Sequence, residues 1–116
     1  MSRESAVMRD VQLELSRLDF NGKRAVSIHR RHIGLFIPLK SAYPIQIGET
    51  GQADWYGHMQ NGRAVEIECK TLDHGSLSPA QRKWRDHCLG MNVLWFLARS
   101  GEFAKQEILR ALRGDK

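Results

Sequence analysis

Residues 54–70, DWYGHMQNGRAVEIECK, contain the clearest structural pattern of the sequence. Two runs rich in aromatic and β-branched residues flank Asn61-Gly62, and Asn-Gly between such runs is the strongest short-range signal for a β-hairpin. In the second run, alternate residues fall on opposite faces of a strand: Val65, Ile67 and Cys69 on one, and Glu66, Glu68 and Lys70 on the other. The sequence therefore predicts a hairpin with one apolar and one charged face.

The charged face is either simply solvated or part of a site. Glu68 and Lys70 project about 6 to 7 Å apart from the same face, and Asp54 lies on the preceding strand of the hairpin. Two carboxylates beside a lysine suit a hard divalent cation such as Mg²⁺, which prefers oxygen ligands. Glu66 is nearer the turn, and we expect it to be solvated. The pattern favours a metal site over an ordinary surface.

The hairpin register raises a difficulty for this site. A strict two-residue turn at Asn61-Gly62 places Asp54 opposite Cys69, which turns the Asp54 side chain to the wrong face. Asp54 and Glu68 can meet only if a bulge or a longer loop shifts the pairing. We therefore predict an irregularity between residues 55 and 63, with Gly57 as the natural place for a bulge.

The first helix is predicted from Ser2, its candidate cap, onward. Its buried stripe follows helical spacing, and Glu4 stands in line with that stripe one turn earlier. The acidic side chain is either part of a site or a first-turn acid favoured by the helix dipole. The stripe consists of Met8, Val11, Leu15 and Leu18.

The rest of the chain alternates between extended and helical patterns. Residues 25–29 read as a strand, and 34–47 as short extended pieces interrupted by prolines, typical of edge strands or an irregular excursion. Ser78, Pro79 and Gln81 predict a helix with a capping box that Gly90 closes, and 93–98 is a strand covered on both faces. A last helix starts at Ser100 or Gly101 and buries Phe103, Ile108, Leu109 and Leu112.

These elements predict an α/β fold of order α-β-β-β-α-β-α, with a mixed sheet flanked by helices. At 116 residues, we expect residues 1–116 to form a single domain with one site. The net charge of +5 favours a polyanionic partner. We expect a cytoplasmic protein with reduced cysteines and no membrane segment, because the N-terminal residues are charged and the longest apolar run is short.

Six segments follow one another between about residue 4 and residue 100. They are, in order, ESAVMRDVQLEL (4–15), HRRHIG (29–34), GQADWYG (51–57), EIECKT (66–71), GSLSPAQRKW (75–84) and GMNVLWFLARS (90–100). Together these segments resemble the VRR-NUC branch of the PD-(D/E)XK nuclease superfamily. The resemblance implies a restriction-endonuclease-like core and cleavage of DNA, usually structured or branched, such as four-way junctions or flaps, with Mg²⁺ or Mn²⁺.

The resemblance also implies roles for individual residues. Asp54, Glu68 and the main-chain carbonyl of Cys69 would be metal ligands, and Lys70 would be the catalytic lysine. Glu4 would bind a second metal or orient water. Gln81 matches a glutamine placed close to the site, although the capping box alone explains it. Because only the Cys69 carbonyl is used, we expect Cys69→Val to keep activity.

Two basic clusters are candidates for contact with the DNA backbone, against the alternative of a solvated surface. Two matched cuts in a four-way junction would require a symmetric homodimer of such a small domain. The other functions left open are a non-catalytic DNA-binding module of the same fold and the nuclease subunit of a restriction-like complex. The clusters are Arg30, Arg31 and His32, and Arg82, Lys83 and Arg85.

Overall fold

The computed structural model describes residues 3–40, 43–72 and 75–114, so the predicted cap at Ser2 lies outside the described residues. Helix α1 (Arg3–Ser16) buries Met8, Val11 and Leu15, three members of the predicted stripe. Leu18 follows the helix and is also buried. The stripe predicted from helical spacing is therefore confirmed.

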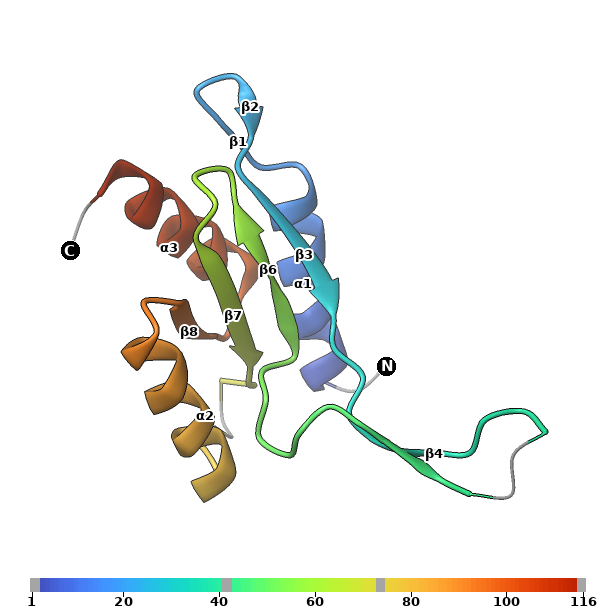
Figure 1. Ribbon diagram of the computed structural model, residues 1–116. Coiled ribbons are helices and arrows are strands. Elements are labelled where there is room, and N and C mark those ends of the chain that lie inside the picture. Colours follow the sequence, from blue (N-terminus) through green and yellow to red (C-terminus); the bar gives the residue numbers. More distant parts are fainter. Residues whose placement is uncertain (1–2, 41–42, 73–74, 115–116) are drawn as a thin grey trace.

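A four-stranded sheet forms the centre of the molecule, in the order β3 (Val26–Arg30), β6 (Trp55–Met59), β7 (Ala64–Cys69) and β8 (Leu94–Ala98). The first three strands are antiparallel, and β8 is parallel to β7. Helices α1 and α3 (Gly101–Arg113) pack together on one side of the sheet, and α2 (Pro79–Gly90) lies on the other (Figure 1). The predicted α/β class and the order of the main elements are confirmed.

The apolar side of the hairpin faces α1 and α3 and contributes Trp55, Val65 and Ile67 to the core. Ile108 of α3 is buried there as predicted, but Phe103 is 45% exposed. Ala104 and Ile108, four residues apart, define the buried stripe of α3, so Phe103 lies at its margin. Phe103 contacts the edge of Phe96, with ring centroids 6.2 Å apart.

Helix α2 begins with the predicted capping box. The Ser78 N–H donates to Oε1 of Gln81 at 2.9 Å, and the Gln81 N–H donates to Oγ of Ser78 at 3.1 Å. Gly90 is the last helical residue, but the left-handed conformation after the helix belongs to Asn92, with φ 60°. The helix therefore ends where expected, with asparagine rather than glycine in the left-handed position.

The turn between β6 and β7 has three residues, Gln60 to Gly62. Met59 and Arg63 close it through a 2.9 Å hydrogen bond from the Met59 N–H to the Arg63 carbonyl, and Gly62 takes φ 87°. Trp55 consequently pairs with Ile67, and Tyr56 with Glu66. The predicted irregularity is confirmed, and its cause is a longer loop with a left-handed glycine.

Gly57 is not the bulge that the sequence suggested. It pairs regularly with Val65 on one side and with Ile28 on the other. A Cβ atom at this position would lie 1.9 Å from the carbonyl oxygen of Ser27. Glycine is required here because β3 approaches the backbone of β6 too closely for any side chain.

Two small hairpins lie outside the central sheet. β1 (Asp19–Phe20) and β2 (Lys23–Arg24) are joined through Asn21-Gly22, as the turn chemistry indicates. β4 (Gly34–Phe36) and β5 (Ile45–Ile47) form a ribbon that projects away from the sheet (Figure 1). We call residues 33–47 the arm. Its exposed large apolar side chains, among the residues described, are Ile33, Leu35, Phe36, Ile37, Leu39, Tyr43, Ile45 and Ile47.

Within the described ranges, no helix combines the length and apolar character that crossing a membrane requires.

Candidate functional site

Three carboxylates from distant parts of the sequence meet at one end of the hairpin. Glu4 comes from the first turn of α1, Asp54 directly precedes β6, and Glu68 lies near the end of β7. One oxygen from each residue lies within 4.8 Å of the others. The three-residue turn makes this possible, because the register that pairs Trp55 with Ile67 continues to place Asp54 opposite Glu68.

Asp54 is held by main-chain hydrogen bonds. Its Oδ2 accepts from the Cys69 N–H at 2.8 Å, and its carbonyl accepts from the Arg31 N–H at 2.9 Å. The N–H and C=O of one residue in an antiparallel strand face the same neighbour, so the Cys69 carbonyl is also turned toward Asp54. The Cys69 side chain is fully buried on the opposite face, as expected, and burial raises the pKa of its thiol.

Glu68 is almost completely buried, with 3% of its surface exposed. Burial raises the pKa of its carboxyl group to about 8, and the charge of Asp54 and a hydrogen bond with Asp54 act in the same direction. Glu4 adds a smaller contribution, which Lys70 opposes. These effects favour the protonated form of Glu68 when no cation is bound.

Gln81 connects α2 directly to this carboxylate. Its Nε2 donates to Oε1 of Glu68 at 3.1 Å, while its Oε1 accepts from the Ser78 N–H. The capping box fixes the amide so that its donor faces the site. Gln81 thus combines the structural role expected from the sequence with a position that orients Glu68.

Lys70 directly follows β7 and is half-buried. Its N–H donates to the Ala98 carbonyl at 3.1 Å, which continues the β7–β8 ladder to the edge of the site. Just after Lys70, the Arg99 guanidinium donates to the carbonyl of Thr71, and it also donates to that of Gly75. Main-chain hydrogen bonds therefore hold Lys70 and its neighbour Thr71.

The expectation that Glu66 is solvated is wrong, because only 8% of its surface is exposed. Arg31 forms a two-pronged ion pair with it, with Nη2 2.8 Å from Oε2, and Trp84 Nε1 donates to Oε1 at 2.9 Å. The guanidinium also donates to the Ala53 carbonyl and lies over the Tyr56 ring. These contacts engage the guanidinium that we expected to bind DNA, so the structure gives that role of Arg31 no support.

Sequence reasoning missed this cluster because alternation alone cannot distinguish a solvated face from one covered by a helix. Helix α2, predicted from its capping box, covers the charged face of β7 and brings Trp84 onto Glu66. The cluster joins Arg31, which directly follows β3, to β7 and α2 beside the three carboxylates.

The other basic residues lie on either side of the site. Arg30 and His32 line a cavity of about 730 Å³ between α1 and β3, together with Arg9, which the sequence did not single out. Ser5 and Trp55 also line it, and these are the neighbours of Glu4 and Asp54. Arg82 and Lys83 are exposed on α2, and Arg85 is half-buried beside Asp86.

Comparison with known proteins gives a likeness among solved structures. No family model matches the chain, and no curated protein matches its sequence. Among solved structures, a "VRR_NUC domain protein" is similar over 100% of this chain and 93% of its own, with a TM-score of 0.67 and 15% sequence identity. The likeness shows that this chain has the fold of that protein, as the sequence motifs predicted.

Proposed function

We propose that the protein is a divalent-metal-dependent endonuclease that hydrolyses phosphodiester bonds in structured or branched DNA, such as four-way junctions or flaps. The observation that carries this proposal is the meeting of Glu4, Asp54 and Glu68 within 4.8 Å, with Lys70 directly beyond β7. The fold shared with a VRR_NUC domain protein supports the nuclease class.

The donor set fits Mg²⁺ or Mn²⁺. Three carboxylates this close repel one another, and the pKa of Glu68 is raised by burial and, after that, by this repulsion. A hard cation with oxygen ligands would relieve it. Asp54, Glu68 and the Cys69 carbonyl would hold the ion, and Glu4 would hold a second ion or a water molecule. When bound, the ion supplies a Lewis acid for the phosphoryl oxygen and lowers the pKa of a bound water.

The chain's own groups then have distinct tasks. The Lys70 ammonium would position the attacking water or balance the charge that develops on the phosphoryl group. Gln81 would keep Glu68 in one orientation through the 3.1 Å hydrogen bond. Basic residues on both sides of the carboxylates would contact the DNA backbone, which gives affinity without sequence specificity. These residues are Arg9, Arg30 and His32 on one side, and Arg82, Lys83 and Arg85 on the other.

The working unit is a homodimer formed through the arm. Its eight exposed apolar side chains present on the order of 1,000 Å² on the two faces of the ribbon together, and a standard interface needs roughly 800 Å² per partner. Among the described residues of the arm, Lys40 is the sole charged side chain, so the surface suits a second apolar arm better than DNA. Pairing of identical arms gives a two-fold interface, as two matched cuts require.

Cleavage of a substrate panel tests the activity. Labelled four-way junction, flap, duplex and single-stranded DNA would be incubated with Mg²⁺, with Mn²⁺ or with EDTA. We expect metal-dependent cleavage of the branched substrates, and a loss of at least about 100-fold in Asp54→Ala and Lys70→Ala. Glu14→Ala, which removes another carboxylate of α1, and Cys69→Val should cleave like the wild type.

Activity in EDTA, or equal cleavage by wild type and Lys70→Ala, would overturn the mechanism. Salt-sensitive binding without cleavage of any substrate would instead identify a non-catalytic DNA-binding module.

A further inference from the structure

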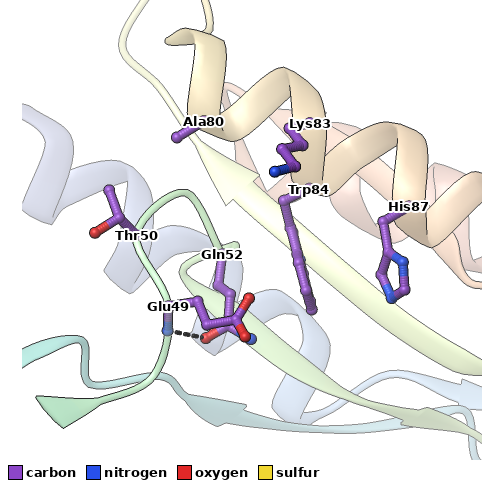
Figure 2. A pocket seen from close by; sticks show the side chains of 7 residues that line it. All are labelled: Glu49, Thr50, Gln52, Ala80, Lys83, Trp84 and His87. Atoms are coloured by element: carbon purple, nitrogen blue, oxygen red, sulfur yellow. Dashed lines mark hydrogen bonds between the residues drawn. The ribbon is translucent and has the colours of Figure 1, made fainter.

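A second cavity, of about 590 Å³, lies between α2 and the segment that contains Glu49, Thr50 and Gln52. Figure 2 shows Trp84 edge-on, with Glu49 and Gln52 on one side of the ring plane and His87 on the other. Oε1 of Gln52 accepts from the Glu49 N–H at 2.8 Å, which fixes the wall opposite the ring. The cavity is lined by Glu49, Thr50, Gln52, Ala80, Lys83, Trp84 and His87.

The lining suits a flat ligand with a polar edge. The half-buried indole of Trp84 already has the His87 ring beside it, with ring centroids 5.1 Å apart, and the Arg31 guanidinium carbon lies 5.7 Å from the centroid of the Trp84 ring. The part of the ring that faces the cavity offers a surface on which a flat ligand can stack, and the carboxylate, hydroxyl and amide of Glu49, Thr50 and Gln52 offer acceptors and donors. Stacking combined with hydrogen bonds to the base edge is how proteins hold an unpaired nucleobase. Glu49 disfavours a phosphate inside the cavity, whereas its carboxylate can accept from the amino group of a base.

The cavity is tied to the acidic site by two short connections. Trp84 lies three residues after Gln81 on α2, so the two side chains are neighbours on the helix surface. Trp84 Nε1 donates to Glu66, and Gln81 Nε2 donates to Glu68, two residues further along β7. The cavity and the carboxylates therefore lie side by side along one face of β7, with Lys83 exposed at the cavity and free to approach a backbone phosphate.

We propose that this cavity binds one unpaired nucleobase of the DNA substrate, stacked on Trp84, next to the phosphodiester bond that is cleaved. The inference rests on the proposed nuclease function and adds a source of selectivity. A fully paired duplex must unstack a base to fill the cavity, whereas a flap or a junction offers one at little cost. Trp84 is then a residue that determines substrate preference.

The test measures DNA binding in Ca²⁺, so that it does not depend on cleavage. The probes are a duplex with a short single-stranded flap, a set of the same flap with one abasic residue at each position in turn, and the plain duplex. We expect one abasic position to weaken binding to the wild type about 10-fold. In Trp84→Leu that position should make no difference, while the plain duplex should bind both proteins alike.

Trp84→Phe is the matched control, because it loses the hydrogen bond to Glu66 but keeps an aromatic face. It should retain most of the abasic effect, which separates stacking from the structural role of the indole N–H. An abasic effect that persists in Trp84→Leu, or that is absent in the wild type, would overturn the inference while leaving the nuclease proposal intact. A wild type that binds no probe would overturn both.

Discussion

The two larger hairpins of this protein use similar chain lengths in opposite ways. The β6–β7 hairpin is central in the sheet, and all but the first residue of β7 are buried. The β4–β5 hairpin projects from the sheet, and most of its large apolar side chains are exposed. The first hairpin buries charge and the second exposes apolar surface, which is the reverse of what solvation alone would favour.

Each exception indicates a function. The buried carboxylates Glu66 and Glu68 are retained because one pairs with Arg31 and the other faces Asp54 and Glu4. The exposed apolar residues of the arm, from 37% exposed at Ile33 to 92% at Leu39, present apolar surface that a partner could cover. We therefore expect substitutions in the first hairpin to lower stability and activity. Substitutions in the second should weaken the association of two chains.

The largest effect should come from Gly57→Ala. The added Cβ would lie 1.9 Å from a carbonyl oxygen of β3, so the central strands must separate. We expect a loss of about 3 kcal/mol or more in the free energy of unfolding, measured by urea denaturation. Gly62→Ala has open space around its Cβ and bears only the strain of φ 87°, so it should cost about 1 kcal/mol. Equal losses of unfolding free energy in the two variants would mean that the close approach of β3 does not require glycine at position 57.

The next effect concerns the buried pair behind the site. Arg31→Met leaves the Glu66 carboxylate buried without its counter-charge, and should cost about 3 kcal/mol of unfolding free energy in urea. The double variant Arg31→Met, Glu66→Leu should regain much of that loss, because no unpaired charge remains. Arg85→Ala, which breaks a surface pair with Asp86, should change stability by less than about 1 kcal/mol. A double variant as unstable as the single one would contradict this account.

A smaller effect depends on pH in the metal-free protein. The native state keeps a proton on Glu68 up to a pKa of about 8, whereas the unfolded chain releases it near 4.5. Between these values the unfolded state binds fewer protons, so the contribution of Glu68 to stability falls as pH rises. The thermal midpoint should drop by about 5 °C more between pH 5 and pH 8 in the wild type than in Glu68→Gln. Identical pH profiles of the thermal midpoint in the two proteins would exclude Glu68 as the cause. Added Mg²⁺ should raise the wild-type midpoint more at pH 8 than at pH 5.

The smallest effect on folding should come from the arm. Leu35→Lys combined with Ile37→Lys should convert a dimer into a monomer in light scattering, yet change the unfolding free energy of the monomer by less than about 0.5 kcal/mol. As a control, Glu102→Lys combined with Gln106→Lys, at two exposed positions of α3, should leave the mass unchanged. A wild type that is monomeric, or a variant that stays dimeric, would show that the arm does not form a dimer interface.

The sequence allowed much of the site to be predicted, because its signals are local. Helical spacing placed Glu4 on α1, and the capping box placed Gln81 at the start of α2. Whether Asp54 and Glu68 meet depends on the length of the turn between the two strands. The alternation of apolar residues showed that a two-residue turn would place Asp54 on the wrong face. The three-residue turn is favoured over a two-residue turn because it pairs Trp55 with Ile67 and Gly57 with Val65 on the core side.

What escaped prediction depends on contacts between distant elements. Gly57 looked like a bulge because its close neighbour, Ser27, belongs to another strand. Glu66 looked solvated because the residues that cover it, Arg31 and Trp84, lie far away in the sequence. Phe103 was expected to be buried because helical spacing alone does not say which side of α3 faces the core. Ala104 and Ile108 face it, which leaves Phe103 at the margin. Burial by a third element leaves no periodic trace in the strand that it covers.

The parallel pairing of β7 with β8 also determines when the site can exist during synthesis. Glu68 and Cys69 lie opposite Leu97 and Ala98, so β7 remains an unpaired edge until the chain has been made to about residue 98. All four side chains of the proposed centre, Glu4 to Lys70, are synthesised well before that point. An unfinished chain therefore carries the complete set of reactive groups without the strand that aligns them, and hydrolytic capacity should appear only when the last third of the domain has folded.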